Sequence, residues 1–240
     1  MKKLQLLLLL SLACFVLSPV DAAFAKKGTQ EVVSDTVADP HSKYTAKYES
    51  ANHSHCTAIL ISSTVALTAK HCGGDYHTTY NGTIYPGGSG LKTPFGYMNI
   101  STYIPNSKYD IAILKGTEKD QSKDYHYYIK PFKTTVAAFS DQELYGIMGL
   151  DLYSYGYPYK FSGYKQYRSD GSIYYYYKNA AFVHTSLPTY EGQSGSGAFL
   201  KDGRFVGIII TRTEKFEGNF LPFTQEIADW VNTNSNGPVS

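Results

Sequence analysis

Three short motifs carry residue types that together could cleave a peptide or ester bond. The motifs contain His71, Asp110 and Ser194, in that order along the chain. An imidazole beside a serine hydroxyl can take up the hydroxyl proton, and a carboxylate can orient the imidazole. These residues therefore form a candidate catalytic set. The motifs are Thr68-Ala69-Lys70-His71-Cys72, Tyr109-Asp110-Ile111-Ala112-Ile113 and Gly192-Gln193-Ser194-Gly195-Ser196-Gly197.

The order of the motifs separates two fold classes. The order His, Asp, Ser belongs to the chymotrypsin-like double barrel, whereas an α/β-hydrolase needs its histidine after its serine. None of the seven histidines lies beyond Ser194. The residue two places after Ser194 is Ser196, where the nucleophile elbow of an α/β-hydrolase has glycine. The sequence therefore excludes an α/β-hydrolase triad built on Ser194.

Residues 1–25 have the layout of a secretory signal peptide. Two lysines precede an apolar run, and Ala23-Phe24-Ala25 has the small-x-small pattern of a cleavage site. The run is too short for a membrane span. A lipoprotein signal ending at Cys14 is an alternative interpretation. We expect export with cleavage, so the mature protein would be extracellular or periplasmic.

The rest of the chain has the length of a single domain or of two small barrels that share a cleft. The net charge of +2 gives no electrostatic case for nucleic acid binding. We expect a monomer with no stable membrane association. The expected divisions are a short propeptide or flexible extension over 26–40, a peptidase unit over 41–240, barrels over about 41–135 and 136–225, and a helix over about 223–232.

Two cysteines remain once Cys14 is removed with the signal peptide. An even pair in an oxidising compartment usually forms a disulfide, and a bond between Cys56 and Cys72 would hold the residue next to His71. A zinc site that also uses His53 and His55 is the alternative. The spacing of these residues matches no standard zinc motif. We therefore expect a disulfide and no metal ion.

Between the motifs, the sequence is typical of an all-β protein. Short stretches rich in β-branched and aromatic residues alternate with turn signals. One helix is expected where Ile227, Trp230 and Val231 share a face, followed by a frayed polar tail from Asn232. The expected strands are 57–61, 64–68, 111–114, 182–184 and 205–211. The expected turns are Asn81-Gly82, Pro86-Gly87-Gly88, Asp170-Gly171 and Asp202-Gly203.

With these motifs, the chain resembles trypsin-like serine peptidases, in the bacterial branch that includes glutamyl endopeptidases and exfoliative toxins. The resemblance implies an all-β fold of two packed antiparallel β-barrels with a C-terminal helix. It also implies a serine endopeptidase that acts on a protein or peptide substrate and needs no cofactor. The carrying segments are 67–72, 110–114, Tyr155-Gly156-Tyr157-Pro158, 192–197 and Gly207-Ile208.

The resemblance assigns further roles around the serine. The backbone N–H groups of Gly192 and Ser194 would form the oxyanion hole, and glycine at 192 would allow the required backbone turn. In the animal enzymes an aspartate just before the serine pairs with a newly freed N-terminus. Here that position is Gln193, so we expect no activation by such an ion pair.

The same resemblance places four residues in the substrate pocket. Thr189 matches a threonine of the acid-binding pocket of glutamyl endopeptidases, whereas Ile209 stands where that branch has a histidine. Thr211 and Arg212 occupy positions that are usually small. Arg212 has three interpretations: it binds an acidic side chain, it narrows the pocket, or it faces solvent. Pro188 replaces the aspartate of trypsin, so trypsin-type specificity is not expected.

Tyrosine is abundant, with eleven of the 23 tyrosines between Tyr145 and Tyr177. Tyrosines at alternate strand positions would fill a barrel, while an exposed cluster could bind glycans or proteins. The Tyr153, Tyr155, Tyr157 and Tyr159 series fits one strand face. A second function therefore stays open: a catalytically silent pseudoprotease that acts as a secreted binding or toxin-like protein.

Overall fold

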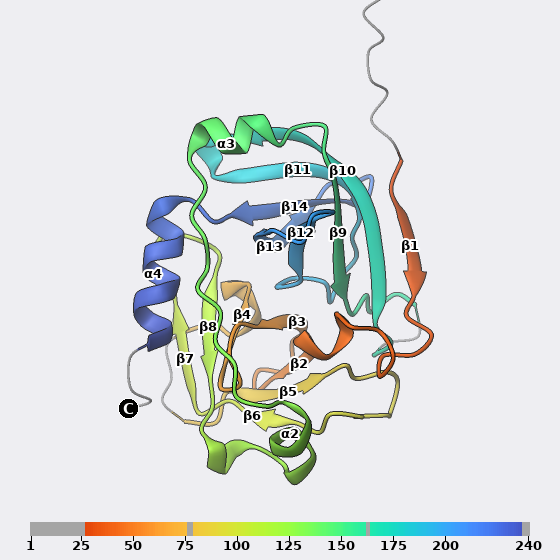
Figure 1. Cartoon of the computed structure of the whole chain (residues 1–240), viewed down its shortest axis with the longest axis vertical. Coiled ribbons are helices and arrows are strands. Elements are labelled where there is room, and N and C mark those ends of the chain that lie inside the picture. The colour runs from red at the N-terminus through yellow and green to blue at the C-terminus, as the bar shows by residue number, and fades with distance from the viewer. Residues whose placement is uncertain (1–26, 76–78, 162–163, 237–240) are drawn as a thin grey trace, which may run out of the picture.

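The computed structural model describes residues 27–75, 79–161 and 164–236 of the 240-residue chain. The expected signal peptide and its cleavage site lie outside this part. The described chain folds into two seven-stranded antiparallel sheets, one above the other in Figure 1. No helix in the described ranges is long and apolar enough to cross a membrane.

The lower sheet in Figure 1 carries the histidine and aspartate motifs. Its strand order is β6-β5-β2-β3-β4-β8-β7, and within the described residues its edge strands β6 and β7 do not pair with each other. It is therefore a curled open sheet rather than a closed ring. The strands are β2 (Thr45–Ser50), β3 (His55–Leu60), β4 (Val65–Thr68), β5 (Gly82–Pro86), β6 (Met98–Asn99), β7 (Thr102–Pro105) and β8 (Ala112–Lys115).

The upper sheet carries the serine motif and closes on itself. Its order is β1-β10-β11-β14-β13-β12-β9, and an additional pairing of β9 with β10 closes a ring of six strands that leaves β1 outside. The expected all-β class with two antiparallel barrel-like units is confirmed. The strands are β1 (Thr29–Val32), β9 (Asp151–Gly156), β10 (Tyr167–Tyr177), β11 (Phe182–Pro188), β12 (Gly197–Leu200), β13 (Phe205–Arg212) and β14 (Glu217–Pro222).

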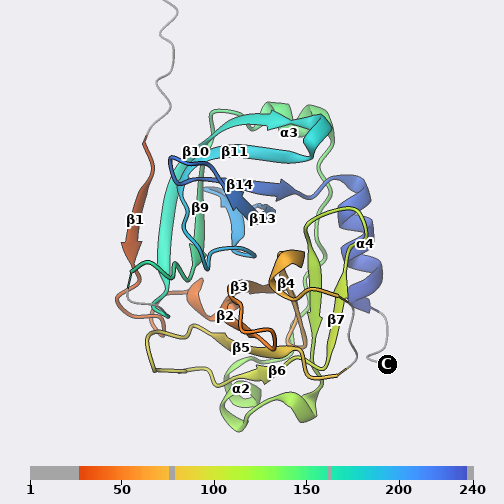
Figure 2. The ribbon, with the colours of Figure 1, turned by 180° about the vertical axis from the view of Figure 1, so that it is seen from behind.

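The helices are short, apart from the last one. Figure 2 shows the C-terminal helix α4 on one side of the molecule and β1 on the opposite side. The short helices α2 and α3 were not expected, although each begins after a serine that accepts a hydrogen bond from the third residue on. The helices are η1 (Ser42–Tyr44), η2 (Lys70–Cys72), η3 (Glu118–Asp120), α2 (Lys123–Tyr128), α3 (Asp141–Gly146), η4 (Lys178–Ala180) and α4 (Gln225–Asn236).

Helix α4 continues past the point where a frayed tail was expected. The side chain of Asn232 accepts a hydrogen bond from the Val136 N–H and donates one to the Val136 carbonyl, both at 2.9 Å. The Ser235 side chain bonds the carbonyl of Val231 one turn earlier. A tertiary contact of Asn232 and a bond of Ser235 within the helix therefore support its extension to Asn236, which the apolar pattern alone could not show.

The expected turn at Asp170-Gly171 is wrong, because both residues lie inside β10. Gly171 instead allows β10 to pack closely against β11. A Cβ on Gly171 would lie 2.8 Å from the Leu187 backbone nitrogen and 2.9 Å from the Ser186 carbonyl carbon. The expected turn at Asp202-Gly203 is confirmed, since it connects the paired strands β12 and β13.

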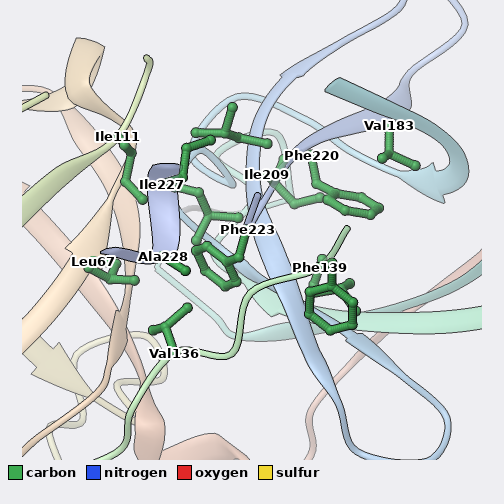
Figure 3. Packing of buried hydrophobic residues seen from close by; sticks show 14 of the residues in the cluster. Leu67, Ile111, Val136, Phe139, Val183, Ile209, Phe220, Phe223, Ile227 and Ala228 are labelled. Carbon is green, nitrogen blue, oxygen red and sulfur yellow. The ribbon is translucent and has the colours of Figure 1, made fainter. Parts of the chain in front are cut away.

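One hydrophobic cluster joins the two sheets and α4. It includes Leu67 from β4, Ile111 next to Asp110, Ile209 from β13, and Ala228 from α4, all almost completely buried. Figure 3 shows these residues facing a shared interior with Phe223. Close-packed interiors of this kind resist displacement of their backbone. The cluster therefore fixes the strand ends from which the three motif residues project.

The tyrosine-rich segment combines buried and exposed rings. Tyr153 and Tyr155 are buried on one face of β9, whereas Tyr157 and Tyr159 lie beyond its end, the first buried and the second 56% exposed. In the Tyr174 to Tyr177 run, burial alternates along β10. Of the eleven tyrosines, only Tyr176 belongs to the hydrophobic cluster of the upper barrel, and Tyr145, Tyr159, Tyr175 and Tyr177 are exposed, so the strand interpretation accounts for part of the series.

Candidate active site

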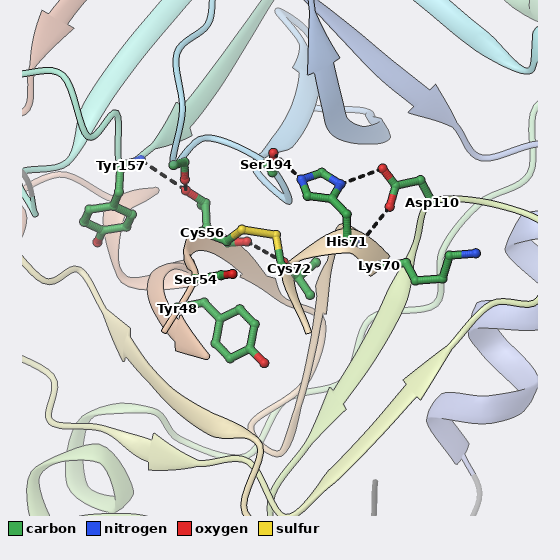
Figure 4. Close-up of a disulfide and its surroundings, with 12 residues drawn as sticks. Tyr48, Ser54, Cys56, Lys70, His71, Cys72, Asp110, Tyr157 and Ser194 are labelled. Carbon is green, nitrogen blue, oxygen red and sulfur yellow. Dashed lines mark hydrogen bonds and ion pairs between the residues drawn. A yellow bond between two sulfur atoms is a disulfide. The ribbon is translucent and has the colours of Figure 1, made fainter. Parts of the chain in front are cut away.

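His71 lies in the 3-10 turn η2, directly after strand β4. Its neighbour Cys72 forms the expected disulfide with Cys56 of strand β3, and both cysteines are buried. Figure 4 shows the disulfide beneath the imidazole ring. The bond therefore ties the histidine turn to the adjacent strand. Because both sulfur atoms are in the disulfide, neither can be a thiolate ligand for zinc.

We expect the disulfide to contribute about 3 kcal/mol to the free energy of unfolding, the value for a loop of about 15 residues. Replacing Cys56 and Cys72 together with alanine should lower the unfolding free energy by at least that amount, measured by urea denaturation. Reductant should destabilise the wild-type protein and leave the alanine pair unchanged. Equal stability of the variant and the oxidised wild type would contradict this prediction.

Asp110 follows a tight loop and immediately precedes the buried Ile111. The Asn106 side chain accepts hydrogen bonds from the backbone N–H groups of Lys108 and Tyr109, which fixes this loop. The Asp110 carboxylate faces His71: Oδ2 lies 2.8 Å from Nδ1, and Oδ1 accepts the His71 backbone N–H at 3.0 Å. Both carboxylate oxygens are therefore engaged by one histidine.

These contacts control the charge of Asp110. Burial raises the pKa of the carboxyl group, but the hydrogen bonds from His71 and the nearby charge of Lys70 outweigh burial and bring the pKa below its usual value. Asp110 is thus an anion at neutral pH. An anion at Nδ1 favours the tautomer that carries a proton there, and this leaves Nε2 free to accept one.

Ser194 completes the series from the other sheet. Its Oγ lies 2.9 Å from His71 Nε2, and Figure 4 shows the imidazole between the hydroxyl and the carboxylate. The structure therefore brings together the three residues singled out from the motifs.

A residue missed by the motif analysis holds the serine loop in place. Thr57 of β3 donates its backbone N–H to the Ser194 carbonyl at 2.9 Å and its hydroxyl to the Gly192 carbonyl at 2.8 Å. The same hydroxyl accepts the Tyr157 N–H. Next to the serine, Gly195 has a φ of +89°, and a Cβ there would overlap the Thr57 carbonyl oxygen. The motif glycine thus allows the two sheets to meet at the serine.

The backbone next to Ser194 can present two N–H groups to a ligand. The Glu191 carbonyl accepts a hydrogen bond from the Tyr159 N–H at 2.7 Å, so the trans peptide directs the Gly192 N–H the opposite way. Gly192 has a φ of +94°, which glycine adopts readily. Among the described residues, neither the Gly192 N–H nor the Ser194 N–H has a backbone acceptor. Two unpaired donors therefore remain beside the hydroxyl.

A pocket of about 380 Å³ opens beside the hydroxyl. The four residues expected in the substrate pocket all line it: Thr189, Ile209, Thr211 and Arg212. The Thr189 hydroxyl is not free, since it donates to the Leu187 carbonyl at 3.1 Å.

Arg212 lies at the rim of this pocket. Its guanidinium group stacks on the Phe216 ring at 4.7 Å and is 3.7 Å from the Glu191 carboxylate. Glu191 is 81% exposed, so this ion pair is weakly held. Arg212 therefore does not simply face solvent, which was one of its three interpretations.

Aromatic side chains pack around Tyr190, which lines the pocket. Tyr190 stacks on Phe216, with ring centroids 5.0 Å apart, and meets Phe161 edge to face. Lys160 lies 4.9 Å from the centre of the Tyr190 ring. The abundance of aromatic residues in the sequence gave no means of selecting Phe161 and Phe216.

Comparison with protein families bears directly on this site. The family model described as "Trypsin-like peptidase domain" matches residues 56–208, which include all three motifs. This chain belongs to the trypsin-like peptidase family. It is accordingly a serine endopeptidase, a class of hydrolase, as the motifs predict. Comparison with curated protein sequences finds no significant match.

Solved structures of similar fold support the architecture of this trypsin-like peptidase. A Glu endopeptidase bound to MPD superimposes with a TM-score of 0.69 at 20% identity, covering 88% of this chain and 98% of the other. The protease Anisep from Arthrobacter nicotinovorans gives 0.65 at 16% identity, covering 87% and 100%. Neuropsin, a serine protease of mouse brain, gives 0.61 at 15%, covering 82% and 97%. At these identities, the likeness concerns the fold.

Proposed function

We propose that this trypsin-like peptidase cleaves peptide bonds through an acyl-enzyme formed on Ser194. His71 accepts the hydroxyl proton as the oxygen attacks the substrate carbonyl, and then donates it to the leaving amine. Asp110 holds the imidazole in the required tautomer and stabilises the imidazolium. The observation that carries this proposal is the hydrogen-bonded series from Ser194 through His71 to Asp110, at 2.9 and 2.8 Å.

The unpaired N–H groups of Gly192 and Ser194 are assigned to the oxyanion hole. As the carbonyl carbon becomes tetrahedral, its oxygen gains negative charge, which these donors stabilise without having to reorganise. One such donor contributes about 2.7 to 4 kcal/mol in comparable enzymes. Water then attacks the acyl-enzyme with His71 as the base, and the serine is regenerated. His71 carries every proton transfer in these steps, while Asp110 and the two N–H groups stabilise the charges that develop.

The proposed substrates are proteins or peptides whose side chain before the cleaved bond enters the pocket lined by Thr189, Ile209, Thr211 and Arg212. We further propose that residues 1–25 are a signal peptide and that the protein acts outside the cytoplasm as a monomer. The disulfide is consistent with an oxidising compartment. All groups required for the chemistry come from one chain.

The pocket also bears on the alternative of a catalytically silent binding protein. That function would be favoured if Tyr190 and Arg212 filled the pocket. Both residues line it instead, and about 380 Å³ stays open beside Ser194. The assembled hydrogen bonds and the open pocket therefore favour turnover.

Labelling with a fluorophosphonate tests this proposal, because such a probe reacts only with an activated serine. We expect the wild-type protein to be labelled at Ser194, as located by peptide mapping, and the Ser194→Ala variant to be unlabelled. The matched control is Ser196→Ala, which alters a buried serine of the same motif whose hydroxyl has no hydrogen-bond partner among the described residues. This control should be labelled normally. Folded wild-type protein that resists the probe would refute the peptidase mechanism.

A further inference from the structure

The first described strand, β1, lies against the loop that carries the nucleophile. Its four residues pair with Tyr167–Asp170 of β10, outside the closed ring. Figure 1 shows β1 along the outer edge of the barrel. At its start, a Cβ on Gly28 would overlap the Ser186 carbonyl oxygen and lie 2.6 Å from Pro188 Cδ. Only glycine therefore lets the segment approach the end of β11 this closely.

One side chain of this strand reaches beneath the serine loop. The Gln30 Nε2 group lies 2.7 Å from Ser169 Oγ, 3.1 Å from the Pro188 carbonyl and 3.1 Å from Gln193 Oε1. The Ser169 hydroxyl itself donates to the Pro188 carbonyl at 2.8 Å. Ser169 Oγ is therefore the acceptor for Gln30, and the Pro188 carbonyl fixes which end of the Gln30 amide is the nitrogen.

The acceptor on the loop is equally well defined. Gln193 is 1% exposed, and its Oε1 also accepts the Tyr190 backbone N–H at 2.8 Å. A backbone N–H can only donate, so Oε1 must be the oxygen at this position. Through Pro188 and Gln193, Gln30 thus reaches both ends of the segment 188–193, which contains Thr189, the aromatic Tyr190 and Gly192.

We infer that Gln30 is a positioning residue for this peptidase: through Gln193, its amide orders the loop that presents the pocket, the oxyanion donors and Ser194. This inference rests on the proposed function. The Gln30 amide binds Gln193 without the charge of a freed N-terminus. This accounts for a neutral glutamine at position 193 in this chain. Removing the amide takes one of two donors from the Pro188 carbonyl and one of two from Gln193 Oε1, so the loop is then held only by bonds that do not involve β1. It also loosens the N–H groups of Gly192 and Ser194, which stabilise the oxyanion only if they are held in position before the reaction.

The first test compares Gln30→Met, which keeps the side-chain length and removes the donors, with the control Glu31→Gln on the exposed face of the same strand. We expect Gln30→Met to lower kcat/KM and the rate constant of fluorophosphonate labelling about tenfold. Glu31→Gln should leave both unchanged. Gln30→Asn, which keeps the amide on a shorter side chain, should recover part of the loss.

A double-mutant cycle separates positioning from general destabilisation. If Gln30 acts through Gln193, combining Gln30→Met with Gln193→Met should lower the labelling rate no further than Gln193→Met alone. Additive losses would overturn the inference. So would full activity of Gln30→Met.

A second measurement does not depend on catalysis. In the Ser194→Ala background, Gln30→Met should increase amide hydrogen exchange at Tyr190 and Gln193 about tenfold, whereas exchange in β13 should not change. Unchanged exchange at Tyr190 and Gln193 would overturn the role of Gln30. If exchange is faster in this background but the probe does not label folded protein that retains Ser194, the peptidase mechanism is refuted and the ordering role is retained.

Discussion

Replacing Ser194 with alanine is expected to lower kcat for peptide hydrolysis about a million-fold, and adding His71→Ala is expected to lower it no further. The hydroxyl and the imidazole act as one unit, because each is needed for the proton transfer that forms the nucleophile. Once one is removed, the other has no function left to lose. The remaining rate comes from substrate binding and the oxyanion donors.

The measurement is kcat with a peptide substrate for both single variants and the double variant. Circular dichroism should show that all three retain the fold, since His71 and Ser194 contribute little to the hydrophobic clusters. Losses that multiply in the double variant would contradict a shared mechanism. Full activity of Ser194→Ala would identify a different nucleophile.

Asp110→Asn is expected to lower kcat about ten thousand-fold while the fold is kept. Both oxygens of Asp110 accept hydrogen bonds from His71, one from the backbone N–H and one from Nδ1. An asparagine has one oxygen. When that oxygen accepts the backbone N–H, the amide NH₂ faces Nδ1, which must then accept, so the proton moves to Nε2. A protonated Nε2 cannot take the proton of Ser194.

This prediction is checked by measuring kcat as a function of pH, with Asp124→Asn in the exposed first turn of α2 as the control. The control should behave as the wild type. Because the pKa of Asp110 lies below its usual value, the wild-type carboxylate stays charged well below neutral pH. A loss of less than about tenfold in Asp110→Asn would show that Asp110 does not select the tautomer.

The motifs predicted the parts of the site that depend on local sequence. His71 and Asp110 lie at the ends of buried strands, and the apolar residues beside them identify those strands. The disulfide was predictable because only two cysteines remain after Cys14. Antiparallel barrels were predictable as a fold class. The open edges of the lower sheet were not, because they depend on pairings between strands that are far apart in the sequence.

Other features depend on contacts that no short pattern encodes. Gln30 and Gln193 are common polar residues, and their bond joins positions 163 residues apart. The contacts of Phe216 with Tyr190 and Arg212 depend on how the loop between β13 and β14 folds. The capping box at Ser140 and Glu143 was present as a sequence signal, and it would have located α3.

The hydrogen bond between Ser194 and His71 has a consequence for the order in which the protein is made. It joins residues 123 positions apart, while His71 and Asp110 are 39 apart. Chains generally fold from the N-terminal part first during synthesis. The lower sheet can thus bring His71 and Asp110 together before Ser194 is synthesised. Strand β1 can pair only after β10 has been made. A chain that ends before Ser194 therefore contains His71 and Asp110 but lacks the hydroxyl with which they are proposed to act.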